Sequence, residues 1–370
     1  MPIFWRYLLK SYFRILLLSV LSFIAILLVS RLEEIAQFAT LGAKPSHLLL
    51  FILYQIPYII PIALPLSSLL ASMIVVQRLS QTHELTALRA GGLSLRMVVA
   101  PLLFAGAFLF LLTFTLASEV ATSSHLATRQ MAYRLTAENP LLLLSSAKLA
   151  KQKNVYVQMD TVKSGKALKN LILALPNPSQ NRMALCLAKK VESEGPFLKA
   201  YEVTLLSTIP SETFDHLVIE NQQLLHAAAP DFAQALRKKG WRISPDHLNF
   251  RLLRSRTQAL QEEFGKQIGR QGSKHLAETY SEFIRRLSFG LSGYSFTLLG
   301  VAYGLGISRC PSKRRVLYVL ALAALSLTAF FLGKEFDHLF LVATSLFLLP
   351  HVWIFASSIW TIRKVARGFE

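Results

Sequence analysis

QRLSQTHELTALRAGGLSLR, residues Gln77–Arg96, is a polar stretch between two long apolar runs. Its spacing predicts a short helix that starts at Ser80 or Thr82, where a hydroxyl can accept a hydrogen bond from an unpaired backbone N–H. Glu84 falls in the first turn, where the helix dipole favours an anion. Gly91-Gly92 ends the helix, since glycine adopts the left-handed conformation of a C-terminal cap at little cost. A polar helix therefore interrupts the apolar part of the chain.

Two leucines give this helix, predicted at residues 80–91, an apolar side. Leu85 and Leu88 are three residues apart and share a face of the helix. A helix of about ten residues is only marginally stable in water by itself, so we expect it to dock on another protein. A solvated connecting helix on the membrane surface is the alternative, and spacing alone does not decide between them.

The composition is that of a membrane protein with a sizeable polar domain. The 370 residues are 53% hydrophobic, yet the formal net charge is +19. Several apolar runs exceed the roughly 18 uncharged residues of a membrane span. Much of the positive charge flanks these runs, which favours lipid headgroups over nucleic acid as its partner. Cys186 and Cys310 are the only cysteines and lie far apart, so no disulfide framework or cysteine-rich metal site is predicted.

Six apolar runs predict a membrane α-helical protein with three spans on each side of a polar domain. The predicted domains are residues 1–118, 119–286 and 287–370. Pro57, Pro61 and Pro65 recur every four residues in the second span, which is therefore expected to be bent or locally broken. The predicted spans are Ile15–Ser30, Leu48–Val76, Met97–Ser118, Leu287–Ser308, Val316–Gly333 and Leu339–Ile362.

Lysine and arginine predict the orientation, because positively charged short loops resist translocation. The two termini, the loop with the polar helix and the loop Arg309–Arg315 together carry thirteen of these residues, whereas the other two short loops carry three. Both termini and the polar helix are therefore expected in the cytoplasm. The large domain is expected outside, in the periplasm if the source is bacterial, which predicts a multi-pass protein of the bacterial inner membrane.

The polar domain alternates short β-like runs with turn-forming residues. It begins with a helical extension of the third span, Glu119–Glu138, and ends with helical signals in Gln258–Arg286. Pro230–Lys239 is predicted as a short helix. Regularly spaced short strands favour an inserted β-sandwich or jelly-roll-like domain. The predicted strands are Asn154–Asp160, Leu168–Leu175, Met183–Ala188, Ala200–Ser207 and His216–Ile219.

Motifs for catalysis, nucleotide binding and metal binding are missing from the sequence. It contains no G-x-x-x-x-G-K-[ST], H-E-x-x-H, C-x-x-C or G-x-S-x-G. The nearest charged cluster, His338 beside Lys334, Glu335 and Asp337, is more typical of a solvated loop. The six predicted spans contain no Asp, Glu, Lys or Arg, and His351 is their only ionisable side chain in the usual physiological range. Ion-coupled transporters generally place acidic or histidine groups at membrane depth to bind and release the driving ion. We therefore predict no catalytic, cofactor or metal site and expect a partner to supply energy for any transport.

Two long stretches carry a family pattern. PLSSLLASMIVVQRLSQTHELTALRAGGLSLRMVVAPLL (Pro65–Leu103) contains the pattern R-L-S-x-x-x-E-[LI]-x-A-L-R-A-x-G-[LIV]-S, and YSEFIRRLSFGLSGYSFTLLGVAYGLGISR (Tyr280–Arg309) precedes and forms the fourth span. Together with the order of spans and outer domain, they resemble the lipopolysaccharide export permeases LptF/LptG, also called YjgP/YjgQ. The resemblance covers most of the chain, while the outer domain agrees only in its position and strand-like spacing.

The resemblance implies a permease subunit that is not an enzyme. Two related permeases would form a heterodimer on a dimer of an LptB-type ATPase, which binds the ATP, and a single-span LptC-type protein would join them. Glu84 would meet an arginine in a groove of the ATPase, with Leu85, Leu88 and Arg89 supplying the remaining contact surface. Lipopolysaccharide would lie between the two permeases and then pass along an apolar groove of the outer domain.

Arg31 and Lys44 are the substrate contacts that the resemblance implies, through the phosphates of the lipid. An anchor for membrane headgroups is an equally good interpretation of Arg31. Each buried methylene holds the lipid in the membrane by about 0.8 kcal/mol, so its extraction needs an external energy source. Two other hypotheses remain open: a membrane-embedded lipid-modifying enzyme that uses the outer domain or the His338 loop, and a structural scaffold of an envelope complex.

Overall fold

The computed structural model of the chain divides into two compact units, each described here by itself. The first comprises Met1–Arg31, Leu53–Leu126 and Ile243–Glu370, and the second comprises Leu32–Ile52 and Ala127–Arg242. The structure describes residues 3–40, 44–138, 149–152, 155–163, 167–177, 182–194, 197–209, 216–228, 244–264, 270–305 and 313–367.

Helices form from the apolar runs, as predicted. Among the described residues, five stretches are helical, long and apolar enough to cross a membrane, which makes the chain a multi-pass membrane protein. One of them is continuous from α5 (Leu95–Thr115) through a π-helical turn, η1 (Leu116–Val120), into α6 (Ala121–Glu138), so the predicted helical extension of the third span is confirmed. The others are α1 (Ile3–Val29), α3 (Pro45–Gln81), α11 (Lys313–Glu335) and α12 (Phe340–Ala366).

The remaining long helix, α10 (Arg270–Gly304), contains the predicted fourth span as far as Gly304 and is less apolar than these five; residues 306–308 of that span lie outside the described residues. Its main packing partners are α5 and α12, and its residues 295–302 are all buried. A Cβ on Gly293 would lie 3.1 Å from the Leu109 carbonyl oxygen, and a Cβ on Gly300 would overlap Ser72 Oγ. Small residues let membrane helices approach closely. The serines and glycines that lower the hydropathy of α10 therefore fit its place inside the bundle.

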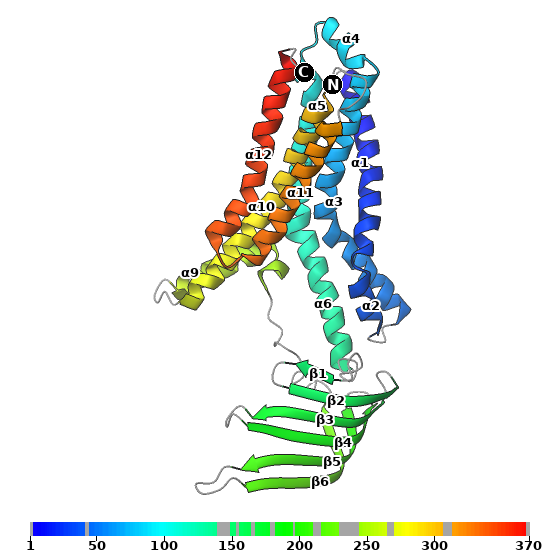
Figure 1. Ribbon diagram of the computed structural model, residues 1–370, viewed down its shortest axis with the longest axis vertical. Helices are drawn as coiled ribbons and strands as arrows, with labels where there is room; N and C mark the ends of the chain where they lie inside the picture. Colours follow the sequence, from blue (N-terminus) through cyan, green and yellow to red (C-terminus); the bar gives the residue numbers. More distant parts are fainter. Residues whose placement is uncertain are drawn as a thin grey trace. The chain divides into compact units, whose positions relative to one another are not determined.

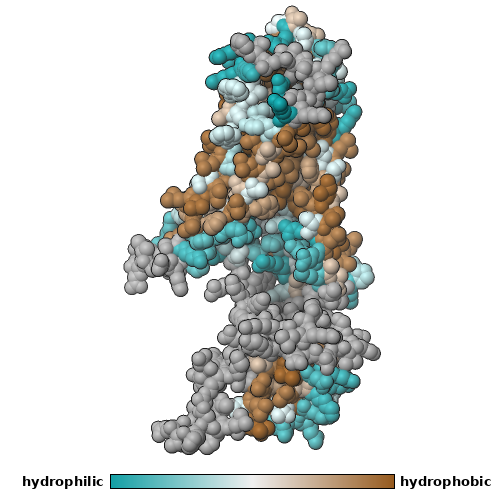
Figure 2. Space-filling view, in the orientation of Figure 1, coloured by the Kyte–Doolittle hydropathy of each residue, from teal (hydrophilic) through white to brown (hydrophobic). Residues whose placement is uncertain are grey.

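The first unit has two ends (Figure 1). One end, here called the α4 end, carries the short helix α4 (Glu84–Ala90) together with the start of α1 and the end of α12. The opposite end, here called the η2 end, carries the 3-10 turn η2 (Pro245–His247) and α9 (Phe250–Phe264). Between the two ends, the face drawn in Figure 2 is mostly hydrophobic, and hydrophilic side chains gather at both ends.

The region around the second span decides between the two predicted outcomes, a bend or a local break, and adds a helix. α3 remains one helix through Pro57, Pro61 and Pro65, so the local break is absent. Its prolines lie in a buried part of the helix, where neighbouring helices can cover the freed carbonyl groups. The preceding loop contains a helix that was not predicted, α2 (Leu32–Thr40), and within the second unit its Phe38 ring stacks on Phe51 at 4.1 Å.

The second unit contains one antiparallel sheet of six strands in sequence order. All five predicted strands are present and the fifth is much longer than predicted, whereas β1 was not predicted. The described strands form a meander, so the second sheet of the predicted sandwich and the crossovers of a jelly roll are absent from them. The strands are β1 (Leu149–Gln152), β2 (Val155–Lys163), β3 (Ala167–Asn177), β4 (Arg182–Glu194), β5 (Phe197–Ile209) and β6 (His216–Ala228).

The register of the sheet places apolar side chains on a common face. Leu171 pairs with Ala188, which pairs with Val203, and all three are buried. Side chains of directly paired residues point to the same side of a sheet, so these three form an apolar row across β3, β4 and β5. The helix predicted at Pro230–Lys239 lies outside the described residues.

Candidate functional site

The polar helix begins differently from the prediction. α3 continues to Gln81, so Ser80 lies inside that helix and is not the residue at which α4 begins. The Thr82 hydroxyl lies 2.9 Å from the Arg78 carbonyl oxygen and 3.1 Å from Glu84 Oε1, both of which are acceptors. His83 then precedes α4 with a left-handed backbone, φ 60°, and without a side-chain cap. One left-handed residue therefore turns the chain from α3 into α4, in place of the predicted cap.

The end of α4 is the predicted glycine cap. Gly92 has a φ of 81°. The N–H of Gly92 donates to the Arg89 carbonyl oxygen, and the N–H of Leu93 donates to the Leu88 carbonyl oxygen, each at 3.0 Å. This pair of bonds is a Schellman motif, whose left-handed residue is favourable for glycine alone. The cap fixes where α4 ends and the next membrane helix begins.

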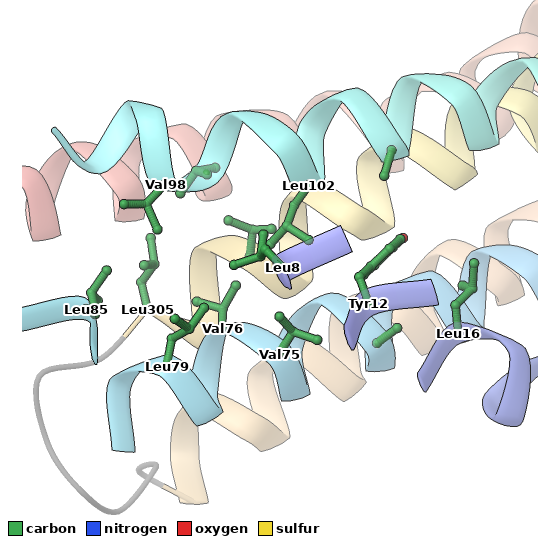
Figure 3. Close-up of a cluster of buried hydrophobic side chains, with 14 of the residues drawn as sticks. Leu8, Tyr12, Leu16, Val75, Val76, Leu79, Leu85, Val98, Leu102 and Leu305 are labelled. Atoms are coloured by element: carbon green, nitrogen blue, oxygen red, sulfur yellow. The ribbon is translucent and has the colours of Figure 1, made fainter. Parts of the chain in front are cut away.

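Leu85 anchors α4 to the membrane helices (Figure 3). Its side chain is 3% exposed and belongs to a buried cluster with Leu8, Leu79, Val98 and Leu305. The four predicted contact residues therefore differ in exposure. Glu84, Leu88 and Arg89 are partly exposed, with Leu88 also packed against this cluster, whereas Leu85 faces the interior of the first unit.

At the η2 end, the first unit contains a cavity of about 240 Å³. Its walls come from α1, α3, the η1–α6 junction, α10 and α11, and they are largely apolar. Four cations line it, namely Arg31, Arg285, Arg286 and Lys334, and Asp246 is the one acid among the lining residues. An excess of positive charge beside apolar walls suits an amphiphile with an anionic head.

Arg31, one of the two predicted substrate contacts, is held at this cavity by a column of rings. Its guanidinium lies 4.9 Å from the centre of the Tyr58 ring. Tyr58 stacks on His125 at 4.8 Å, and His125 stacks on His247 at 4.7 Å. Cation–π contact of this kind orients the guanidinium beside the cavity. The other predicted contact, Lys44, is exposed and belongs to the second unit.

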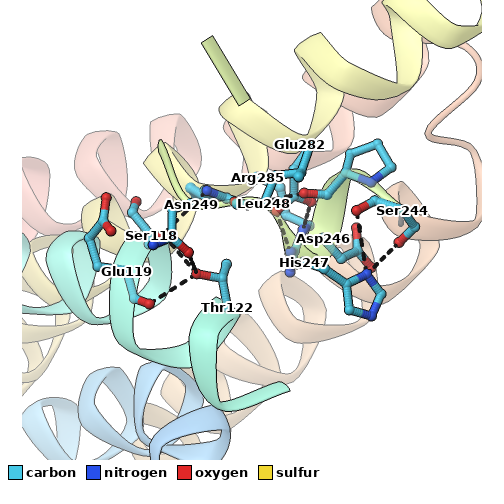
Figure 4. Close-up of polar contacts among 12 residues, drawn as sticks. Ser118, Glu119, Thr122, Ser244, Asp246, His247, Leu248, Asn249, Glu282 and Arg285 are labelled. Carbon is cyan, nitrogen blue, oxygen red and sulfur yellow. Dashed lines mark hydrogen bonds and ion pairs between the residues drawn. The ribbon is translucent and has the colours of Figure 1, made fainter. Parts of the chain in front are cut away.

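Glu282 joins Arg285 and Arg286 of α10, and Figure 4 shows its side chain beside Arg285. Arg285 donates from Nε and Nη2 to its carboxylate at 2.6 and 2.7 Å, and Arg286 Nε donates to Glu282 Oε1 at 2.8 Å. Glu282 is 4% exposed and Arg286 is 1% exposed. Breaking such a buried pair from one side typically costs about 3–5 kcal/mol, because the remaining charge stays buried without its partner. The cluster therefore fixes this end of α10.

Arg286 also holds the two chain segments that lead to and from the sheet. Its Nη2 donates to the Leu248 carbonyl oxygen at 2.7 Å and to the Pro245 carbonyl oxygen at 3.3 Å. Its Nη1 donates to the Ser118 carbonyl oxygen, in the π-helical turn, at 3.4 Å. Beside these bonds, the Thr122 hydroxyl donates to Asn249 Oδ1 at 3.2 Å. One arginine thus fastens both segments to α10.

Asp246 carries a carboxylate whose pKa is perturbed by the same cluster. Burial raises the pKa, but the positive charges of Arg285 and Lys334 outweigh burial and lower it to about 2. The Lys334 ammonium lies 3.4 Å from Asp246 Oδ2. The Asp246 carboxylate is therefore ionised throughout the physiological range, and it offsets part of the positive charge at the cavity.

Sequence reasoning identified Arg31 but missed the two adjacent arginines in the middle of α10. Arg285 and Arg286 stand directly before the apolar run that begins at Leu287, with Glu282 three and four residues earlier. Adjacent arginines with an acid at helical spacing are a local signal that could have marked them. The bonds from Arg286 to Pro245 and Leu248 join residues about forty positions apart in the sequence, which no local pattern reveals.

The His338 cluster is arranged as part of a loop. The Ser281 hydroxyl donates to the Asp337 carbonyl oxygen at 2.8 Å, and His338 is exposed. Burial raises the pKa of the Asp337 carboxyl, with the neighbouring acids Glu278 and Asp246 adding to the shift. Within the described part of the chain, no group of three or more His, Cys, Asp or Glu side chains could hold a metal ion.

Comparison with known proteins identifies the family. The family model for "Lipopolysaccharide export system permease LptF/LptG" matches residues 6–364 of the 370 residues. The match therefore includes both groups of membrane helices, α4 and the sheet. No curated protein matches the chain. The chain belongs to the LptF/LptG family of lipopolysaccharide export permeases, which are transporter subunits and not enzymes.

Proposed function

We propose that this chain is a non-catalytic permease subunit of an ATP-driven complex that extracts lipopolysaccharide from the bacterial inner membrane. It would cross the membrane six times, with α10 as the fourth span and both termini in the cytoplasm. The single observation that carries the proposal is the placement of two unlike features at opposite ends of one helical unit. The α4 end presents a short helix with a partly exposed acid, and the η2 end contains an apolar cavity lined by cations.

The proposed coupling site is the partly exposed surface of α4. Glu84, Leu88 and Arg89 would contact an LptB-type ATPase, and Leu85 would pass force from α4 into the membrane helices through the cluster in which it is buried. A rigid connection of this kind requires that α4 be fixed at both of its ends. The left-handed turn at His83 and the Schellman motif at Gly92 meet that requirement.

The proposed substrate contact is the cavity at the η2 end. Phosphate groups of the lipid would bind Arg31 and its neighbouring cations, while acyl chains would follow the apolar walls. A second, paralogous permease would complete the binding site, and lipid would leave along the apolar face of the sheet towards an LptC-type bridging protein. The apolar row of Leu171, Ala188 and Val203 would form part of such a path.

Reconstitution tests the proposal as a whole. The chain, its paralogue, the ATPase and the single-span protein would be placed in liposomes that contain lipopolysaccharide. ATP should then cause transfer of the lipid to a soluble acceptor, and omission of this chain should abolish the transfer. Lipid transfer without this chain would contradict the proposed role. Chemical modification of lipid by the purified chain without ATPase would support the lipid-modifying enzyme instead.

The orientation predicts that the α4 end faces the cytoplasm. Thr86 is exposed on α4, so a cysteine at this position should react with a membrane-impermeant maleimide. In a background without Cys186 and Cys310, we expect Thr86→Cys to be labelled in inverted membrane vesicles and not in intact spheroplasts. A cysteine at His338, which is exposed at the opposite end, is the matched control and should show the reverse pattern. Labelling of Thr86→Cys from outside would contradict the proposed coupling to a cytoplasmic ATPase.

Arg31→Gln is expected to weaken binding of lipopolysaccharide about 10-fold to 150-fold, because it removes a charge-assisted hydrogen bond to phosphate of about 1.5–3 kcal/mol. Lys44→Gln should have a smaller effect, since fully solvated charges contribute little. Lys10 is exposed in the first part of α1, away from the cavity. Lys10→Gln is therefore the control and should leave binding unchanged. The affinities would be compared in detergent for intact and dephosphorylated lipid. Equal loss for both lipids would contradict a phosphate contact.

A further inference from the structure

A second concave site lies between α9 and the first half of α10. It is a groove of about 450 Å³, formed by residues that do not line the cavity described above. Its walls include Phe250, Leu253, Tyr280 and Phe283, and Arg254 is the one charged residue in its lining. The groove therefore combines an apolar trough with a single positive charge.

Contacts at both ends of the groove hold its two helices together. The rings of Phe250 and Phe283 lie 5.5 Å apart. Gln261 Nε2 donates to the Tyr280 hydroxyl oxygen at 2.6 Å, about three helical turns further along α9. Because an aromatic contact and a hydrogen bond already join α9 to α10, the groove exists before any ligand binds.

The groove lies beside the start of α12 and beside the last turn of α5, where the apolar part of the continuous α5–η1–α6 helix gives way to the more polar α6. The Phe250 ring is 6.1 Å from that of Phe114, in the last turn of α5, and the Tyr280 ring is 6.0 Å from that of Phe340, the first residue of α12. Both α5 and α12 belong to stretches that are long and apolar enough to cross a membrane. An amphipathic helix at this depth meets lipid headgroups on one side and the upper part of the acyl chains on the other.

The groove and the cavity use different faces of α10. Thr279, Tyr280 and Phe283 line the groove, whereas Arg285, Arg286 and Phe289 line the cavity. At about 100° per residue, the centres of these two sets lie about a third of a turn apart around the helix axis. A molecule in the groove is therefore not an extension of one in the cavity.

The positive charges of α9 indicate which kind of ligand suits the groove. Arg251, Arg254 and Arg256 lie in the first half of the helix, which is the half that begins beside the ends of the membrane helices. Apolar side chains beside them are exposed: Leu252 is 56% exposed, and Tyr280 and Phe283 are each 39% exposed. Arginine next to accessible apolar surface matches a molecule that carries both phosphate and an acyl chain.

We propose that this groove binds one anionic glycerophospholipid of the surrounding membrane as a resident lipid. An acyl chain would lie against Phe250 and Phe283, and the headgroup phosphate would accept hydrogen bonds from Arg254. The proposal requires only that the chain is a membrane protein, so it is independent of the transport function proposed above. The lipid would fix α9 at the membrane surface, next to η2 and the segment that returns from the sheet.

Native mass spectrometry of the purified full chain can test this proposal, with phosphatidylglycerol and phosphatidylcholine titrated separately. We expect one phosphatidylglycerol to be retained in preference to phosphatidylcholine. Arg254→Gln should weaken its retention about tenfold, since one charge-assisted contact is lost. Arg251→Gln is the matched control, because it makes the same change on the same helix at an exposed position outside the groove. It should retain the lipid within about twofold of the parent chain.

A second variant blocks the groove without changing charge. Thr257 lines the groove, so Thr257→Trp should remove the bound lipid whatever its headgroup, while the thermal unfolding of the variant reports whether it is folded. Equal weakening by Arg251→Gln and Arg254→Gln would overturn the proposal in favour of non-specific charge attraction. Full retention in both Arg254→Gln and Thr257→Trp would place the lipid elsewhere. Displacement of phosphatidylglycerol from the parent chain by lipopolysaccharide would also overturn it, because the groove would then belong to the substrate path.

Discussion

Glu84→Arg is expected to leave the chain folded and inserted but to abolish its copurification with the ATPase and its stimulation of ATP hydrolysis. Glu84 lies in the first turn of α4 and is partly exposed, and the proposed assembly places an arginine of the ATPase opposite it. The substitution therefore sets two positive charges against each other. Loss of a charge pair at an interface costs about 2–5 kcal/mol, which corresponds to about 30-fold to 5,000-fold in affinity. Pull-down from detergent and ATPase assays in liposomes would measure both effects.

A matched control for this prediction is available at the other end of the first unit. Glu335 is exposed at the end of α11, so Glu335→Arg makes the same change of charge away from α4. It should copurify with the ATPase as the parent chain does. Normal coupling in Glu84→Arg would contradict the proposed role of α4. Loss of coupling in both variants would show that the change in net charge, and not the position, is responsible.

The sequence predicted α4 well because its determinants are local. Gly92 must adopt a φ of 81°, and the bonds that close the cap reach back only three and five residues, so the glycine pair was sufficient to place the end of the helix. The start was misplaced because His83, and not Ser80 or Thr82, takes the special backbone conformation. A hydroxyl side chain near the expected start is weaker evidence for a helix boundary than a glycine at the end. Ser80 lies inside α3, which continues through the expected start of α4.

The parts that sequence reasoning missed depend on distant contacts. The cavity at the η2 end forms because Arg286 reaches the carbonyl groups of Ser118, Pro245 and Leu248, which belong to two other segments of the chain. The meander was missed for a related reason. Short alternating strands are common to sandwiches, jelly rolls and single sheets, and only the pairing of strands distinguishes these folds. Spacing therefore predicted that strands exist, and not how they are connected.

Gly300→Ala is expected to lower the free energy of unfolding by about 1–3 kcal/mol or more, as over-packing of a close helix contact does. A Cβ on Gly300 would overlap Ser72 Oγ and would also press against the Leu69 carbonyl oxygen, both on α3. The serine hydroxyl can rotate away, but the backbone carbonyl cannot. α3 and α10 would have to separate along a contact where Ser72 and Leu299 are fully buried. Thermal unfolding in detergent would show the loss.

Two further variants show whether the backbone contact is the cause of that loss. Gly300→Ala combined with Ser72→Ala should recover only part of the lost stability, because the clash with Leu69 persists. Gly91→Ala is the control, since its Cβ would meet ordinary contacts at 3.5 Å, and it should stay within about 0.5 kcal/mol of the parent chain. Full recovery in the double variant would contradict the backbone explanation. The contact of α3 with α10 at Gly300 also matters for the proposed transport mechanism. α3 leads into α4, and α10 carries Arg285 and Arg286 at the cavity. Force applied to α4 would therefore reach the proposed substrate site only if these two helices remain in contact.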